Sequence, residues 1–170
     1  MHFEEAKKQF VQSWGTFGSD WGINKAMAQV HALLLISPKP LCTDEIMEEL
    51  KISRGNANMT LRSLLDWGII YKVIKPGERK EYFDSEKDLW EMVKKVITER
   101  KKKELEPVAK MLEQVQQISE GPELEVAEFK KVTSELSKFS NRAVDLLETV
   151  IKAEQHWFFG TFFKLLKGKK

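Results

Sequence analysis

The chain has 170 residues, enough to bury a hydrophobic core, with 28 lysines and arginines against 26 acids and a formal net charge of +2. This balance excludes a protein that holds nucleic acid through its overall charge, so any such affinity must come from local basic clusters. The single cysteine, Cys42, excludes an internal disulfide and favours a reducing cytoplasm. Because the first residues contain acids and no long apolar run, we expect no signal peptide.

A short amphipathic helix is predicted from Phe3 to Trp14, with an apolar stripe that needs a partner: Phe3, Ala6, Phe10 and Trp14. The next stretch, WGTFGSDWG at 14–22, mixes aromatic residues with glycines and predicts a turn between helices. These glycines do not match a phosphate-binding loop, because no Lys-Ser or Lys-Thr follows them. A strongly apolar helix is then predicted at 23–36, closed by residues 37–40.

Two further helices are predicted between Thr43 and Gly68. The first has Thr43 as its N-cap, Asp44 and Glu45 in its first turn, and Ile46 and Leu50 on its buried side. The second begins at its cap, Ser53, and ends at Gly68 after a single apolar stripe: Ala57, Leu61, Leu64 and Leu65. Lys51 and Ile52 make the tight turn between these helices.

The opposite side of the second helix is polar, small and almost free of acids, with Asp66 near its end as the exception. It carries Gly55, Asn56, Met59, Arg62 and Ser63, flanked by Asn58 and Thr60. Asn, Arg and Ser side chains hydrogen-bond base edges in the major groove of DNA, whereas an ordinary solvated face would carry glutamates and lysines. This pattern predicts a recognition helix at 53–67.

A two-stranded hairpin, or wing, is predicted at 69–84. Residues 69–74 are β-branched and aromatic, Pro76-Gly77 is a turn dipeptide, and residues 81–83 return as the partner strand. Basic side chains lie at or beside the tip: Lys75, Arg79 and Lys80. Such a tip can reach the DNA backbone and the minor groove, where the negative potential attracts arginine. The alternative is a hairpin that only covers the core.

These residues resemble the winged-helix domain of MarR-type transcriptional regulators, and more closely its GbsR-like branch. The shared motifs are SRGNxxMxLRxLxxWG, from Ser53 to Gly68, and PGERxxYF, from Pro76 to Phe83. The chain departs from that branch at Asn24 and Lys25, where a Pro-Arg pair is common. The resemblance implies a dimeric DNA-binding regulator, without naming the regulated gene.

A helix is predicted after Ser85, with one apolar side: Leu89, Met92, Val93, Val96 and Ile97. The charged run at 99–104 has two interpretations. It is either a solvated helix face or, with Lys94 and Lys95, a set of phosphate contacts. Because Pro107 breaks or kinks a helix, residues 108–118 are predicted as a new helix or a bent continuation.

After a loop at 120–122, apolar residues alternate three and four positions apart, the pattern of a heptad seam: Phe129, Val132, Leu136, Phe139, Ala143, Leu146 and Val150, extended by Ala153 and Trp157. A shorter segment has the same alternation: Leu105, Val108, Leu112 and Val115. The two segments pair either within one chain or between chains, and the sequence leaves both open. The apolar run from Trp157 to Leu166 is too short for a membrane span, and we expect a dimer interface with the N-terminal helix rather than a lipid contact through the basic tail.

No catalytic or metal-binding motif is found, because His2, His31 and His156 are far apart and no nucleophile motif is present. We therefore expect neither an enzyme nor a bound cofactor. The resemblance implies a small effector bound between the winged domain and the dimerisation helices, and its GbsR-like branch is associated with choline and glycine betaine. Aromatic side chains are the candidates to hold such a quaternary ammonium, with core packing as the alternative: Trp14, Phe17, Trp21, Trp67 and Trp90.

The sequence thus predicts a mainly α fold with a small β-hairpin wing, in which a winged helix-turn-helix domain at 23–85 lies between an N-terminal dimerisation helix at 1–22 and a helical dimerisation region at 86–170. The predicted function is a cytoplasmic, homodimeric transcriptional regulator, expected to be a repressor that binds a double-stranded operator. The predicted DNA contacts are Ser53, Arg54, Asn56, Asn58, Met59, Arg62, Ser63, Lys75, Arg79 and Lys80. The alternative is a helical protein-protein interaction module that binds no DNA.

Overall fold

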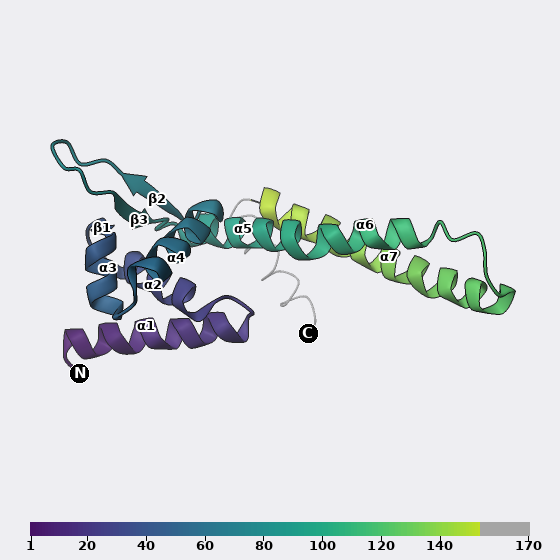
Figure 1. The fold of residues 1–170 in the computed structure, drawn as a ribbon, viewed down its shortest axis with the longest axis horizontal. Coiled ribbons are helices and arrows are strands. Elements are labelled where there is room, and N and C mark those ends of the chain that lie inside the picture. Colours follow the sequence, from purple (N-terminus) through teal and green to yellow (C-terminus); the bar gives the residue numbers. More distant parts are fainter. Residues whose placement is uncertain (154–170) are drawn as a thin grey trace, which may run out of the picture. The chain divides into compact units, whose positions relative to one another are not determined.

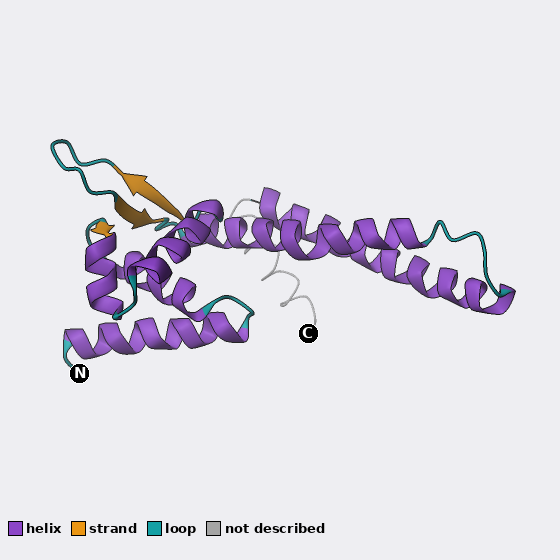
Figure 2. Ribbon diagram, in the orientation of Figure 1, coloured by secondary structure: helices purple, strands orange, loops and turns teal. Residues whose placement is uncertain are grey.

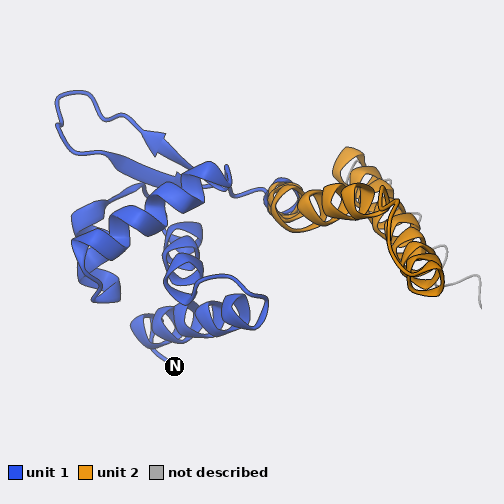
Figure 3. Ribbon diagram, turned by 45° about the vertical axis from the view of Figure 1, so that its right-hand side comes forward, with its two compact units in different colours: residues 1–92 blue, residues 93–170 orange. Residues whose placement is uncertain are grey.

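The computed structural model describes residues 1–153. The chain forms two compact units, residues 1–92 and residues 93–170 (Figure 3). The first holds the winged helix and the second a helical hairpin. Predictions for Trp157, for the run from Trp157 to Leu166 and for the basic tail lie outside the described residues. Within residues 1–153 no helix is long and apolar enough to cross a membrane.

The first unit begins with two packed helices, α1 (Phe3–Asp20) and α2 (Lys25–Ile36). The turn predicted at 14–22 was wrong, because α1 continues to Asp20 and only the last two residues turn. The reason is the contact with α2, which needs glycine. A Cβ atom on Gly15 would lie 2.5 Å from Cγ of Gln29, and one on Gly18 would lie 2.5 Å from Cβ of Ala28. The glycines therefore allow close helix packing, which outweighs their poor helix propensity.

Helix α2 forms the centre of the first core. Asn24 caps it by accepting a hydrogen bond from the backbone N–H of Met27 at 3.1 Å. Its side chains Val30, Leu33 and Leu34 are almost completely buried. The predicted apolar helix is confirmed and lies behind the two helices that follow.

Those helices are α3 (Thr43–Leu50) and α4 (Arg54–Asp66). The prediction of Thr43 as the N-cap of α3 was wrong, because Cys42 holds that position and its backbone N–H donates to Glu45 at 2.7 Å. Ser53 caps α4 as predicted, accepting from the N–H of Asn56 at 3.3 Å. Gly68, at φ +68°, follows the end of α4 in the left-handed conformation that glycine favours.

The wing forms as predicted, but it belongs to a larger sheet than the expected hairpin. Strands β2 (Ile70–Val73) and β3 (Tyr82–Ser85) pair antiparallel, and β3 also pairs with β1 (Leu41–Cys42) in the order β1-β3-β2 (Figure 2). Strand β1 has only two residues, so no alternation in the sequence could reveal it. Its pairing joins the start of α3 directly to the wing.

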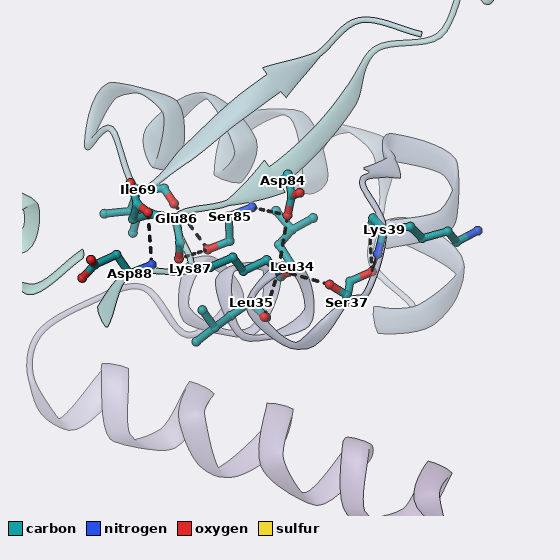
Figure 4. Close-up of polar contacts among 10 residues, drawn as sticks. All are labelled: Leu34, Leu35, Ser37, Lys39, Ile69, Asp84, Ser85, Glu86, Lys87 and Asp88. Carbon is teal, nitrogen blue, oxygen red and sulfur yellow. Dashed lines mark hydrogen bonds and ion pairs between the residues drawn. The ribbon is translucent and has the colours of Figure 1, made fainter. Parts of the chain in front are cut away.

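Lys87 links the end of the wing to the C-terminal end of α2 (Figure 4). The ammonium of Lys87 donates to the carbonyl oxygens of Leu34, Leu35 and Ser37 at 2.7, 2.9 and 3.1 Å. It also pairs with Asp84 at 3.2 Å. A helix C-terminus carries carbonyl groups without helical partners and a partial negative charge, so a cation is favourable there.

Helix α5 (Leu89–Arg100) leads through a π-helical segment, Lys101–Leu105, into α6 (Glu106–Val115). Residues 108–118 were predicted as a new helix or a bent continuation, and the structure has the continuation. Pro107 lies in the first turn of α6, where its missing N–H costs little, and the wide π-helical turn precedes it. Ion pairs along the charged run, such as Lys103 with Glu99 at 3.2 Å, are those of a solvated helix face.

Helix α7 (Glu123–Lys152) returns antiparallel along α6 (Figure 1). Lys101 pairs with Glu148 at 3.0 Å, and the Gln116 side chain donates to the carbonyl oxygen of Thr133 at 3.1 Å. The pairing of these segments within one chain, left open by the sequence, is therefore present. The predicted heptad residues of α7 nevertheless remain largely exposed.

Candidate nucleic-acid interface

Helix α4 has one buried side and one exposed side. Ala57, Leu61 and Leu64 are buried in the core of the first unit at 0, 2 and 1% exposure. Met59 and Arg62 lie on the opposite side and are exposed, Met59 at 60%. The apolar stripe therefore fixes which side of the helix faces out, and that side carries the residues predicted to read DNA.

Several polar groups of α4 are already engaged within the helix. Asn56 accepts a hydrogen bond from the hydroxyl of Thr60 at 3.3 Å, and the Ser63 hydroxyl donates to the carbonyl oxygen of Met59 at 3.1 Å. Thr60, placed by the helical pattern on a flank of the polar side, is buried at 3%. Asn58 and Arg62 are both exposed and carry the donors suited to base edges.

An acid that the sequence analysis did not assign to this surface joins three of its parts. Asp44, in the first turn of α3, pairs with Arg54 of α4 at 2.6 Å and with Lys80 beside the wing tip at 3.0 Å. Hydrogen bonds from Lys80 and Arg54 lower the pKa of Asp44. Two of the predicted DNA contacts thus share one carboxylate. Asp44 did not stand out in the sequence as part of this surface, because an acid in the first turn of a helix is expected in any case.

The tip of the wing is organised around Tyr82, which pairs with Val73 at the last step of the β2-β3 ladder before the turn. The ammonium of Lys75 lies 3.6 Å from the centre of the Tyr82 ring. The Tyr82 hydroxyl donates to Glu78, and this hydrogen bond is the main reason that the pKa of Tyr82 is raised to about 12. The turn is closed by Gly77 at φ +83° and by a hydrogen bond from the Glu78 N–H to the Lys75 carbonyl at 3.1 Å.

The three predicted wing cations therefore have different surroundings. Lys75 packs on Tyr82, Lys80 pairs with Asp44, and Arg79 is exposed near the turn. Of the three, Arg79 is best placed to reach a phosphate or a minor groove without losing a contact within the protein.

The candidate ligand-binding aromatics fall into separate places. Trp14, Phe17 and Trp21 form a row along α1, with ring centres 6.0 and 5.3 Å apart in turn. Trp67 lies at the end of α4, and Trp90 is in α5 with 9% exposure. An open depression of about 680 Å³ borders Phe17, the one candidate that lines it. A cage for a quaternary ammonium needs several ring faces around one point, so the row on α1 is the part of the candidate set that comes closest.

His31 lies in the core of the first unit at 5% exposure, beside Trp14 at 6.3 Å between ring centres. Burial, helped by the nearby charge of Lys87, lowers its pKa to about 4. Within residues 1–153 no three His, Cys, Asp or Glu side chains are grouped to hold a metal ion.

Comparison with known proteins supports the helix-turn-helix assignment. Residues 28–72 match the model of a family described as "Bacterial regulatory protein, arsR family". The matched range holds α3, α4 and the start of the wing. It covers less than half of the chain, and the family differs from the MarR type that the motifs resemble.

Two curated proteins of Bacillus subtilis (strain 168) are similar over 88 residues, 52% of this chain. The "Putative HTH-type transcriptional regulator YvaV" is 24% identical over half of its own length, and the "HTH-type transcriptional repressor OpcR" is 23% identical over 48% of its length. The chain thus matches about half the length of these relatives. A solved structure described as "Crystal Structure of a transcriptional regulator" has a TM-score of 0.56 at 15% identity, covering 85% of this chain and 99% of that one. This likeness shows the fold, a mainly helical winged helix.

Proposed function

We propose that the chain is a DNA-binding transcriptional regulator that acts as a homodimer. One observation carries the proposal: α4 is held in the core by its apolar stripe and turns outward a side with Asn58, Met59 and Arg62, on which Asp66 at the end of the helix is the one acid. A wing with an exposed Arg79 belongs to the same unit. The similarity to proteins named as transcriptional regulators supports this choice.

In this proposal α4 enters the major groove and the wing touches the backbone or the minor groove. Arg62 offers a bidentate donor to guanine, Asn58 can pair with adenine, and Met59 can contact a thymine methyl group. Arg79 supplies a contact to phosphate or the minor groove. The motifs at 53–68 and 76–83 support placement in the GbsR-like branch of MarR-type regulators.

The proposed dimer binds a pseudo-palindromic site. Two recognition helices related by a two-fold axis must meet successive major grooves about ten base pairs apart. Such a dimer that covers a promoter represses transcription, and one relative, OpcR, is named as a transcriptional repressor. This role places the protein in the cytoplasm with the DNA.

A quaternary ammonium is the proposed effector class, and the row of Trp14, Phe17 and Trp21 supports it. Phe17 and Trp21 are 51 and 59% exposed, so part of each side chain is accessible to a cation. Titration with choline, glycine betaine and a neutral isostere, read by Trp fluorescence and by DNA affinity together, tests this. An effector must change both signals, because it acts only through different affinities for two conformations.

The main test is a selection of binding sites from random duplexes, followed by a salt titration of the selected duplex. Phosphate contacts release counterions, so six to ten contacts should lower affinity by roughly 10³ to 10⁵ between about 50 and 200 mM salt. A protein-protein interaction module would select no duplex and show no such slope. That result would remove the proposed function.

A further inference from the structure

Helix α7 has two contact faces, and the described chain uses one of them. Thr133 and Ser140 are buried at 7 and 6% exposure, on the side of α7 that meets α6 and the π-helical segment. The contacts from Gln116 to Thr133 and from Lys101 to Glu148 lie on this side. The pairing within the chain is therefore made by small and polar residues of α7, and not by its heptad seam.

The seam itself is exposed to solvent over most of the helix. Its exposed fractions are 43% for Phe129, 47% for Val132, 51% for Leu136, 73% for Phe139 and 65% for Leu146. At about 100° per residue, the seam lies roughly a quarter turn around α7 from Thr133 and Ser140. A contiguous apolar stripe of this length is unusual on a free surface and marks an interface.

Helix α6 continues this apolar surface. Val108 and Met111 are 43 and 46% exposed, and the antiparallel course of the two helices puts them on the same side of the hairpin as the seam. Each helix of the hairpin thus has one contact face inside the hairpin and a second one about a quarter turn away. This is how helices are arranged in a four-helix bundle, where each contacts two neighbours.

We propose that the seam is covered by the seam of a second copy of this chain, in an antiparallel four-helix bundle of two hairpins. The two-fold axis passes between Leu136 and Phe139, so that Leu136 faces Phe139 of the partner subunit. The heptad spacing then determines the next pairs on each side of the axis. Val132 faces Ala143 of the partner subunit, and Phe129 faces Leu146 of the partner subunit.

Charge on the open flank of the seam selects the antiparallel direction. The flank facing away from α6 carries Glu135 and, seven residues later, Arg142. Antiparallel pairing places Glu135 opposite Arg142 of the partner subunit on both sides of the axis, although Glu135 also pairs with Lys138 of its own helix at 2.8 Å. Parallel pairing would place Glu135 opposite Ser140 of the partner subunit, with no charge to match.

The direction in which the two α7 helices pair also determines whether the α6 helices of the two subunits become neighbours. In an antiparallel pair the flanks occupied by α6 lie on the same side, so the two α6 helices become neighbours and cover Val108 and Met111. In a parallel pair they lie on opposite sides and those side chains stay exposed. The choice of a second copy as the occupant of the seam rests on the proposed function, a dimeric regulator. The position of the apolar surface and the antiparallel direction are argued from the residues of α6 and α7 alone.

Sedimentation of the full chain without DNA tests the surface. We expect a dimer at micromolar concentration for the wild type and a monomer for Phe139→Glu, whose exposed position should leave the hairpin folded. The matched control is Asn141→Glu, an exposed position of α7 outside the seam, which should remain a dimer. A monomeric wild type, the expected result if residues 154–170 of the same chain cover the seam, would overturn the proposal, as would a dimeric Phe139→Glu.

Disulfide crosslinking in a Cys42→Ser background tests the direction. Val132→Cys together with Ala143→Cys should crosslink two chains, whereas each single variant should not. Crosslinking of Val132→Cys alone would indicate the parallel arrangement and overturn the antiparallel one. A charge exchange gives a second measure: Glu135→Arg should weaken the dimer by about tenfold, and adding Arg142→Glu should restore it.

These measurements separate this interface from the proposed function. A wild type that binds the selected duplex but sediments as a monomer would overturn the interface and keep the DNA-binding role. A dimer with the expected crosslinks that selects no duplex would keep the interface and overturn the regulator.

Discussion

Arg62 is the residue on which the proposed DNA contact depends most. It lies on the exposed side of α4, opposite the buried Leu61 and Leu64. If its guanidinium reads a guanine, Arg62→Ala should cost roughly 1 to 3 kcal/mol of binding free energy and relax sequence preference at one position. Fluorescence anisotropy on the selected duplex and on single-base variants would measure both. Wild-type affinity and preference would exclude Arg62 from base recognition.

Arg79 should behave differently, because a wing contact to phosphate carries no base information. Arg79→Ala should weaken binding to all duplexes by a similar factor and reduce the slope of log affinity against log salt by about one. The salt titration with two unrelated duplexes distinguishes this result from that of Arg62→Ala. A loss confined to one sequence would instead assign Arg79 to base recognition.

Asp44 limits the positive charge of the proposed DNA surface. Because its carboxylate pairs with Arg54 and Lys80, phosphates must compete with it for two cations. Asp44→Asn should therefore raise affinity for non-specific duplex several-fold and steepen the salt dependence. Glu48→Gln, an exposed position on the same helix, is the control for removal of one negative charge. If both variants gain equally, the effect is one of net charge and not of the bridge.

His31 makes the first unit sensitive to acid. Its pKa is lowered from 6.5 to about 4 in the folded chain, mainly by burial, so the unfolded chain binds more protons between these values. Stability should therefore fall as pH decreases from about 6.5 toward 4, by up to roughly 3 kcal/mol from this residue. Urea unfolding at both ends of the range, for the wild type and His31→Leu, measures it. An equal acid loss in the variant would assign the effect to other groups.

At the scale of elements, the close packing of α1 on α2 depends on glycine. Gly18→Ala would bring a methyl group to 2.5 Å from Cβ of Ala28, so the helices must shift. We expect a loss of roughly 1 to 3 kcal/mol in unfolding free energy. Gly55→Ala is the matched control, because nothing lies within 4 Å of a Cβ there and the change should be neutral or slightly stabilising. Denaturant unfolding of both variants decides whether the contact or the helix propensity dominates.

At the scale of the whole molecule, dimerisation should determine DNA affinity. Two linked recognition helices bind a two-fold site far more tightly than one, because the second contact is intramolecular. Phe139→Glu should therefore lower the affinity for a duplex with two half-sites by more than about tenfold and leave the affinity for one half-site unchanged. Asn141→Glu should match the wild type on both duplexes. Equal loss on the single half-site would indicate damage to the winged helix itself.

Local patterns in the sequence determined most of the helices and the wing. The cap at Ser53, the apolar stripe of α4 and the glycine after it are short-range signals, because a helix is specified by residues within a few turns. The hairpin strands and the Pro76-Gly77 turn were recognisable for the same reason. These patterns also determined which side of α4 faces outward, and hence the core of the candidate site.

Only the tertiary structure decided the features that depend on contacts between distant segments. The sequence around Gly15 and Gly18 predicted a turn, and only the packing of α2 against these glycines explains their place in a helix. Strand β1 exists only because Phe83 and Tyr82 pair with it. The bridge from Asp44 to Arg54 and Lys80 joins residues 10 and 36 positions apart. The heptad pattern predicted an interface on α7, but periodicity is the same for a partner in the same chain or another. The burial of Thr133 and Ser140 on the α6 side of α7 is what leaves the seam exposed within residues 1–153, because one face of a helix can meet only one neighbour.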